Sequence, residues 1–196
     1  MLLDGTSVAQ TIEQNIAEAI AASSHRKPGL AFVLVGDNPA SRTYIRMKKM
    51  RCAEVGIVSF DCELPATTSE EDLLKHIDAL NRNPEVDGIL VQLPLPEHIN
   101  LPKILSAVDP AKDVDGFHPI NAGKLLMGER DGFIPCTPHG IHVLLHHYQI
   151  PLLGKHVVIV GRSNIVGKPL AALLMQKAPN CNATVTVVHS LSENLG

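Results

Sequence analysis

Short apolar runs alternate with amphipathic segments along most of the chain, and this alternation constrains the fold more than any other feature. Continuous apolar runs are typical of strands buried on both faces, whereas apolar residues spaced three or four apart are typical of helices. The pattern predicts an α/β protein with a mostly parallel sheet and right-handed crossovers. The predicted strands are residues 30–35, 57–62, 88–91, 156–160 and 184–188. The predicted helices are residues 8–22, 40–54, 68–83, 101–108, 137–148 and 168–177.

Two of these helices have recognisable start signals. Thr68-Ser-Glu-Glu71 resembles a capping box, which predicts Thr68 as an N-cap. Thr137-Pro138 predicts an N-cap followed by proline at the first helical position. Residues 118–138 are rich in glycine and proline and are the candidate domain junction.

Composition excludes several classes of protein. The chain of 196 residues is 45% hydrophobic and 19% charged, as expected for a soluble protein of one or two domains. Its net charge of −3 gives no support for nucleic-acid binding. No apolar run approaches membrane-spanning length, and residues 1–5 lack the features of an export signal. The cysteines have no CxxC spacing and are interpreted as reduced thiols, which favours the cytoplasm. They are Cys52, Cys62, Cys136 and Cys181.

Polar residues follow the predicted strands at their carboxyl ends, where ligands bind in open parallel sheets. Tyr44 and Lys48 lie one helical turn apart after the first strand, and Gln92 directly follows the third. Asp113 and Asp115 offer two carboxylates in a later loop. Taken singly these signals are weak, because a lysine on a helix is usually solvated surface.

Residues 155–169 read as a buried strand, a glycine-bounded turn and a helix, which is the form of a dinucleotide phosphate loop. The turn departs from G-x-G-x-x-G, since Ser163 replaces the middle glycine and Gly167 falls one place late. By itself this segment fits an ordinary strand-turn-helix as well as it fits a dinucleotide loop. After the next strand no acidic residue occurs until Glu193, whereas Arg162 and Ser190 suit a 2′-phosphate. NADP is therefore favoured over NAD.

Taken together and in order, these motifs closely resemble the methylenetetrahydrofolate dehydrogenase/cyclohydrolase family. The resemblance covers almost the whole chain. It rests on Tyr44-Ile-Arg-Met-Lys48, Asp87-Gly-Ile-Leu-Val-Gln-Leu-Pro-Leu-Pro96, Lys112-Asp-Val-Asp-Gly-Phe117, Pro135-Cys-Thr-Pro138 and Gly161-Arg-Ser-Asn-Ile-Val-Gly-Lys-Pro169. It implies oxidation of 5,10-methylenetetrahydrofolate with NADP, then hydrolysis of the methenyl product to 10-formyltetrahydrofolate. It further implies a homodimer in one-carbon metabolism and purine biosynthesis.

The same resemblance assigns roles to individual residues. Lys48 and Gln92 are the candidate catalytic residues, with Gln92 positioning the lysine. Tyr44 and Asp115 are the candidate substrate-binding residues, while Asp113 is interpreted as structural. The candidate cofactor residues are Gly161, Arg162, Ser163, Gly167 and Ser190. One departure is that residues 191–194 are neutral to acidic, where members often carry a basic residue.

The chemistry explains why a lysine suits the hydrolytic step. Water must lose a proton as it attacks the methenyl carbon, so a neutral amine is the required form. Neighbouring cations favour that form. They are Arg42, Arg46, Lys49 and Arg51. Hydride transfer chiefly needs orientation of the reacting groups, because the folate nitrogens assist it.

The expected organisation is a folate-binding catalytic domain at residues 1–118, a linker and helix at 119–150, and a Rossmann-like NADP domain beginning at 151. A full six-stranded domain of that type needs about 130–150 residues, so the expectation is that this chain carries only its start. Two alternatives remain open. One is another two-domain NADP dehydrogenase, acting for instance on shikimate-like acids, and the other is a non-catalytic folate-binding fragment.

The remaining candidate residues are interpreted as structural rather than functional. His142 and His146 have metal-like spacing, but no carboxylate accompanies them, so surface histidines are favoured over a metal site. Cys136 is expected to be a packed thiol. Thr137 is expected first as a helix cap and only secondarily as a cofactor neighbour.

Overall fold

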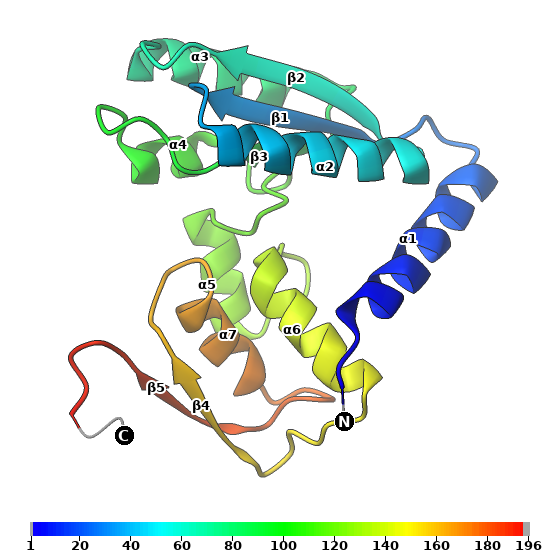
Figure 1. The fold of residues 1–196 in the computed structure, drawn as a ribbon, viewed down its shortest axis with the longest axis vertical. Coiled ribbons are helices and arrows are strands. Elements are labelled where there is room, and N and C mark those ends of the chain that lie inside the picture. The colour runs from blue at the N-terminus through cyan, green and yellow to red at the C-terminus, as the bar shows by residue number, and fades with distance from the viewer. Residues whose placement is uncertain (1, 194–196) are drawn as a thin grey trace. The chain divides into compact units, whose positions relative to one another are not determined.

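The computed structural model describes residues 2–193 and divides into two compact units. The first is Thr6–Val114, and the second combines Met1–Gly5 with Asp115–Gly196, of which residues 2–5 and 115–193 are described. The division falls at Val114–Asp115, just ahead of the glycine- and proline-rich segment 118–138. A second boundary falls at Gly5–Thr6, where helix α1 (Gly5–Ala22) begins and continues into the first unit (Figure 1).

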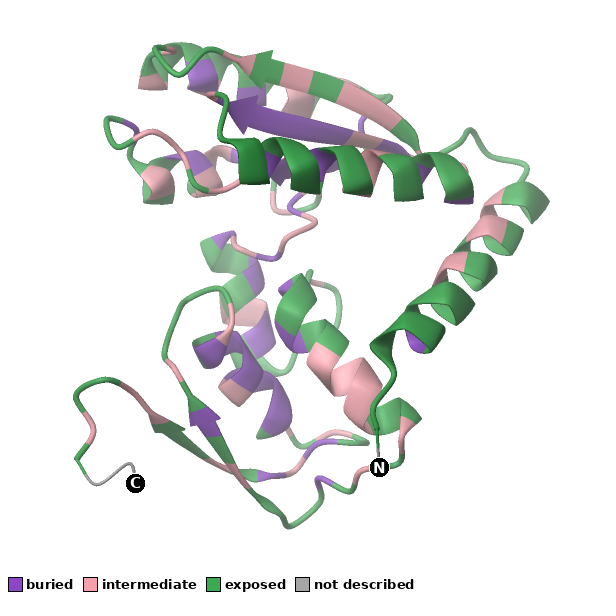
Figure 2. Cartoon of the chain, in the orientation of Figure 1, coloured by how far each residue is buried: buried purple, intermediate pink, exposed green. Residues whose placement is uncertain are grey.

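The first unit is built on a parallel three-stranded sheet in the order β2-β1-β3. Its strands are β1 (Gly29–Val35), β2 (Val58–Leu64) and β3 (Gly88–Val91). The central strand β1 is almost wholly buried, as the continuous apolar sequence predicts (Figure 2). Helices α2 (Pro39–Val55), α3 (Glu70–Arg82) and α4 (Leu101–Ala107) complete the unit. The predicted α/β class is confirmed.

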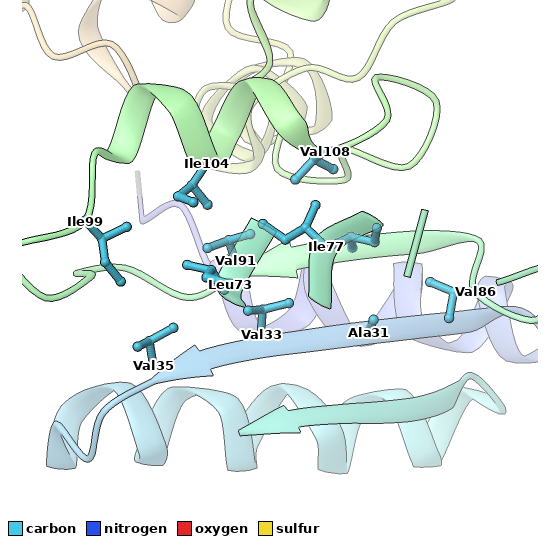
Figure 3. Packing of buried hydrophobic residues seen from close by; sticks show 11 residues of the cluster. Ala31, Val33, Val35, Leu73, Ile77, Val86, Val91, Ile99, Ile104 and Val108 are labelled. Atoms are coloured by element: carbon cyan, nitrogen blue, oxygen red, sulfur yellow. The ribbon is translucent and has the colours of Figure 1, made fainter. Parts of the chain in front are cut away.

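Alternate residues of β1 enter two separate cores, because successive strand side chains point to opposite faces. On one face Val33 packs with Leu73 and Ile77 of α3 and with Ile104 of α4 (Figure 3). On the other face a smaller cluster connects the sheet to α2. Its buried members are Phe32, Leu34, Ile45, Cys52 and Leu90. The carboxyl end of β1 therefore leads into a helix fixed on the sheet by its own apolar stripe.

The second unit has a parallel two-stranded sheet, β4 (His156–Val160) paired with β5 (Thr184–Val188). Helix α7 (Gly167–Leu174) contributes six buried residues and connects the two strands. Its side chains Leu170 and Leu174 pack with Ile159 of β4. Helices α5 (Pro119–Met127) and α6 (Cys136–His147) form the rest of this unit.

Helix α5 is absent from the sequence prediction, which interpreted residues 118–138 only as a junction. Its signals are nevertheless present. Pro119 is at the first helical position, and Gly128 ends the helix in the left-handed conformation at φ 79°. The N-cap is His118, whose Nδ1 accepts a hydrogen bond from Ile120 N at 3.0 Å. Histidine is not among the favoured N-cap residues, so this start was not recognised.

Two predicted caps are wrong. The N-cap of α3 is Ser69 rather than Thr68, and its hydroxyl accepts a bond from Asp72 N at 3.1 Å. Asp72 then replaces Glu71 as the acidic partner of the capping pair. Helix α6 starts at Cys136, so Thr137 lies inside the helix and Pro135 occupies the cap position without a side-chain bond. Within residues 2–193, no helix combines the length and apolar character needed to cross a membrane.

Candidate active site

Helix α2 places Tyr44 and Lys48 on one face. Asn38 begins the helix by accepting bonds from Ala40 N and Ser41 N at 3.0 and 3.1 Å, and Pro39 occupies the first turn. Tyr44 is 60% exposed, whereas Lys48 is half-buried. The phenol is therefore open to a ligand, and the amine is partly enclosed by the unit.

Lys48 is joined to the exit of β3. Its Nζ donates to Gln92 Oε1 at 3.4 Å. Gln92 extends the sheet ladder past the end of β3, because its backbone N–H donates to Val33 O at 2.9 Å. Its side-chain Nε2 donates to Leu93 O at 2.8 Å. Two residues 44 positions apart in sequence are thus brought together at the carboxyl edge of the sheet.

The cations around Lys48 are less available than the sequence suggests. Arg42 pairs with Glu63 at 3.3 Å and Lys49 with Asp61 at 2.6 Å, so both connect α2 to the edge strand β2. Arg51 pairs with Glu54 at 2.8 Å. Carboxylates therefore offset three of the four charges expected to favour a neutral lysine. The fourth residue, Arg46, lines a hollow of about 540 Å³ together with Arg42, Lys49 and Glu63.

The two carboxylates of the Lys112–Phe117 motif occupy different environments. Asp113 is 4% exposed, and its backbone bridges to Ile89 of β3. Lys112 Nζ donates to Asn81 O at 2.7 Å and to Asn83 O at 2.9 Å, so it satisfies carbonyls at the end of α3. Asp115 is partly exposed and belongs to the second unit. The first half of the motif is therefore structural, and Asp115 is the accessible carboxylate.

Gly116 explains why a glycine follows Asp115. It has φ +67°, and a Cβ there would lie 2.7–2.8 Å from backbone atoms of Phe133, Ile134 and Pro135. No other residue fits without moving one segment. The turn carrying Asp115 is thereby pressed against the segment that leads into α6.

In the second unit the glycine-bounded turn after β4 has specific geometry. Gly161 has φ +127°, and its N–H donates to Val188 O at 2.8 Å, which ties the turn to the end of β5. A Cβ on Gly167 would overlap the carbonyl group of Gly161, so only glycine allows α7 to start so close to the turn. Ser163 Oγ accepts bonds from Val166 N at 3.1 Å and Gly167 N at 3.3 Å. The serine that replaces the motif's middle glycine thus binds the backbone N–H groups at the start of α7 from the preceding turn.

Arg162 and Ser190 follow the ends of the adjacent strands β4 and β5, which are in register at Val160 and Val188. Both are exposed, and among residues 2–193 no hydrogen bond or ion pair holds the Arg162 guanidinium. Ser190 lies in a short turn fixed by His189 N donating to Ser192 Oγ at 2.9 Å. Two donors of the type that binds phosphate are therefore presented at one edge of the sheet.

The histidines and Cys136 have other surroundings. His142 Nε2 lies 2.8 Å from Asn180 O and 3.5 Å from Cys181 Sγ, so it bridges α6 to the loop before β5. Burial lowers the pKa of His139, and the neighbouring His142 adds to this effect. The part of the chain that the structure describes contains no group of three metal-binding side chains. Cys136 is exposed, so the expectation of a packed thiol is wrong.

These features define a two-part α/β protein in which a lysine–glutamine pair lies in one unit and a dinucleotide-type turn lies in the other. Comparisons with known proteins agree with this class. The profile for the catalytic domain of tetrahydrofolate dehydrogenase/cyclohydrolase matches residues 3–115, and the profile for its NAD(P)-binding domain matches residues 135–196. The chain belongs to the tetrahydrofolate dehydrogenase/cyclohydrolase family, which confirms the resemblance inferred from the motifs.

Curated relatives include bifunctional protein FolD of Protochlamydia amoebophila, 55% identical over 195 residues, and that of Chlamydia trachomatis, 56% identical. All of this chain aligns, and it spans 67% and 68% of these relatives. The FolD structure of Campylobacter jejuni has TM-score 0.95 and 45% identity, covering 99% of this chain and 68% of that one. The Trypanosoma brucei enzyme, solved with NADP and an inhibitor, has TM-score 0.91 and 38% identity, covering 98% and 65%.

Proposed function

We propose that this protein oxidises 5,10-methylenetetrahydrofolate to 5,10-methenyltetrahydrofolate with NADP and hydrolyses the product to 10-formyltetrahydrofolate. Family membership supports both activities. The related Trypanosoma brucei structure with bound NADP supports the cofactor. The observation that carries the hydrolytic half is the hydrogen bond between Lys48 and Gln92.

In the hydrolytic step Lys48 accepts the proton of the attacking water. A base in this role must lie within hydrogen-bond reach of that water, which requires an amine held in one place. Gln92 Oε1 provides that restraint, because it accepts a bond from Nζ and has its own amide fixed by Leu93. Gln92 is neutral, so it orients the amine without adding a charge that would favour the protonated form.

In the oxidation step the residues chiefly orient the substrate. Tyr44 is exposed one turn before Lys48, and its ring offers a surface for the flat pterin. Asp115 supplies a bidentate acceptor for the pterin's amino and ring N–H donors. Asp113 is a poor candidate for that contact, because it is almost fully buried within the sheet unit.

The cofactor's pyrophosphate is proposed to lie against the turn from Gly161 to Gly167, as at other helix N-termini. Ser163 keeps that turn closed on α7. Arg162 and Ser190 bind the 2′-phosphate, since both are exposed at the ends of neighbouring strands. The first unit accordingly carries Tyr44 and the hydrolase residues Lys48 and Gln92, and the second carries the cofactor residues, with Asp115 at its start.

The resemblance to the family also supports a cytoplasmic homodimer that takes part in one-carbon metabolism and purine biosynthesis. The direct test of the proposed function is the purified protein mixed with methenyltetrahydrofolate. Hydrolysis is followed as loss of that compound's absorbance, and oxidation as NADPH formation from methylenetetrahydrofolate. Absence of both reactions in a protein that binds folate would contradict the proposal.

A further inference from the structure

The carbonyl oxygen of Leu93 accepts two hydrogen bonds in the first unit. One comes from Gln92 Nε2 at 2.8 Å, and the other comes from Ser41 Oγ at 3.4 Å. Gln92 in turn accepts the bond from Lys48. A continuous chain of contacts therefore runs from Ser41 through the Leu93 carbonyl and the Gln92 amide to the lysine amine.

The orientation of the Gln92 amide decides what the lysine meets. A glutamine side chain presents an acceptor on one side and a donor on the other, and a half-turn exchanges them. Leu93 O can only accept, so it draws Nε2 toward itself and leaves Oε1 facing Lys48. A carbonyl oxygen has two lone pairs, and Ser41 uses the second one.

The surroundings of Ser41 hold its hydroxyl in position for this contact. It is 2% exposed and lies in the first turn of α2, where its backbone N–H is held by Asn38 Oδ1 at 3.1 Å. Its hydroxyl bonds across to the exit of β3, 52 positions away in sequence. Two residues later the hydroxyl of Thr43 instead bonds back to Pro39 O of the same helix at 2.9 Å. Of these two hydroxyls, that of Ser41 is therefore the one that bonds to the segment carrying Gln92.

We propose that Ser41 is a positioning residue for hydrolysis, which fixes the Leu93 carbonyl and through it the Gln92 amide that holds Lys48. The inference rests on the proposed roles of Lys48 and Gln92. A buried hydroxyl that bonds to Leu93 O rather than to the lysine thereby helps to hold the base in place.

The test compares Ser41→Ala and Ser41→Cys with Thr43→Ala as the control. Cysteine nearly fills the space of serine but is a weak donor, so it separates the lost bond from a packing defect. We expect both Ser41 variants to lower kcat of hydrolysis by about three- to tenfold, the effect of one neutral hydrogen bond, with KM little changed. Thr43→Ala should leave kcat unchanged. If the alanine variant does not fold, kcat of the cysteine variant decides the outcome.

A double-variant cycle tests the route. With Gln92→Met there is no amide to orient, so adding Ser41→Ala should lower kcat by less than about twofold. An equal fall in both backgrounds, or no fall in the folded single variants, would overturn the proposal.

A second readout does not need activity. The side-chain amide protons of Gln92, assigned by their loss in Gln92→Met, should exchange faster with solvent in both Ser41 variants and not in Thr43→Ala. Unchanged exchange in the Ser41 variants would contradict the positioning role. If the wild-type protein lacks hydrolysis, the proposed function fails, while this exchange measurement still decides whether Ser41 holds the amide.

Discussion

Arg26 and Asp87 form a two-bonded ion pair, with Nη1–Oδ2 at 2.7 Å and Nη2–Oδ1 at 2.8 Å. Asp87 Oδ2 also accepts a bond from Gly29 N at 2.7 Å. The pair thus connects the entry of β1 to the residue just before β3. This contact aligns the two strands whose carboxyl ends lead to Lys48 and Gln92.

The Arg26 guanidinium, together with the Gly29 N–H, holds the pKa of Asp87 below its usual range. A carboxyl with a lowered pKa in the folded state adds stability above its unfolded pKa, about 3.9, and loses it as pH falls through the lower folded value. We expect Asp87→Asn to lower Tm at pH 7, with the difference from wild type shrinking below about pH 4. Thermal unfolding from pH 3 to 7 checks this. A difference independent of pH would show that charge is not the cause.

Lys48→Met should abolish hydrolysis and leave part of the oxidation. Only hydrolysis requires proton transfer from water, and a general base contributes at least about 100-fold to such a step. The measurement is methenyltetrahydrofolate hydrolysis alongside NADPH formation for each variant. Thr43→Ala, on the same helix, is the control. Equal loss of both activities, with folate binding intact, would count against a specific hydrolytic role for Lys48.

Asp115→Asn should weaken folate binding far more than it disturbs the fold. The change removes a charge and half of the acceptor pair, which corresponds to about 1.5–3 kcal/mol in binding free energy. Titration with folate, followed by fluorescence quenching or thermal shift, measures it. Asp113→Asn is the matched control, and because Asp113 is buried it should lower Tm instead. Unchanged folate affinity in Asp115→Asn would contradict the pterin role of this carboxylate.

Arg162→Ala should reduce the preference for NADP over NAD, because it should weaken the binding of NADP and leave that of NAD unchanged. Loss of one charged contact to a 2′-phosphate corresponds to roughly a tenfold rise in the Kd of NADP. Lys168→Ala is the control, since it removes a positive charge from the same region but one already bonded to Asn164 at 2.7 Å. Both cofactors are compared by calorimetry or kinetics. A wild-type preference for NAD would instead assign selectivity to residues 191–193.

Much of the architecture was predictable from local sequence. The strands Gly88–Val91, His156–Val160 and Thr184–Val188 have the predicted bounds, and all the strand pairs are parallel. Buried strands are specified by continuous apolar runs, and such runs do not depend on distant partners. Helix ends were less predictable, as Ser69, Thr137 and the whole of α5 show. A cap is one hydrogen bond among several possible neighbours, and backbone geometry selects it.

The candidate site, like the fold, was predictable from the sequence only in part. Lys48 and Gln92 were predicted to meet, because residues after parallel strands lie at one edge of a sheet, and a hydrogen bond joins them. The role of Asp115 came only from the resemblance to the family. The sequence did not reveal that carboxylates on β2 offset Arg42 and Lys49.

Nor did the sequence indicate how the site is held. Ser163 accepts a bond from Val166 N at the start of α7, and Ser41 bonds to Leu93 from another element. A change of a few tenths of an ångström in the donor–acceptor distance decides whether such a hydrogen bond forms. Residue type and spacing along the chain therefore determined the family and the fold, whereas the partners of each polar group were decided only when packing brought distant segments into register.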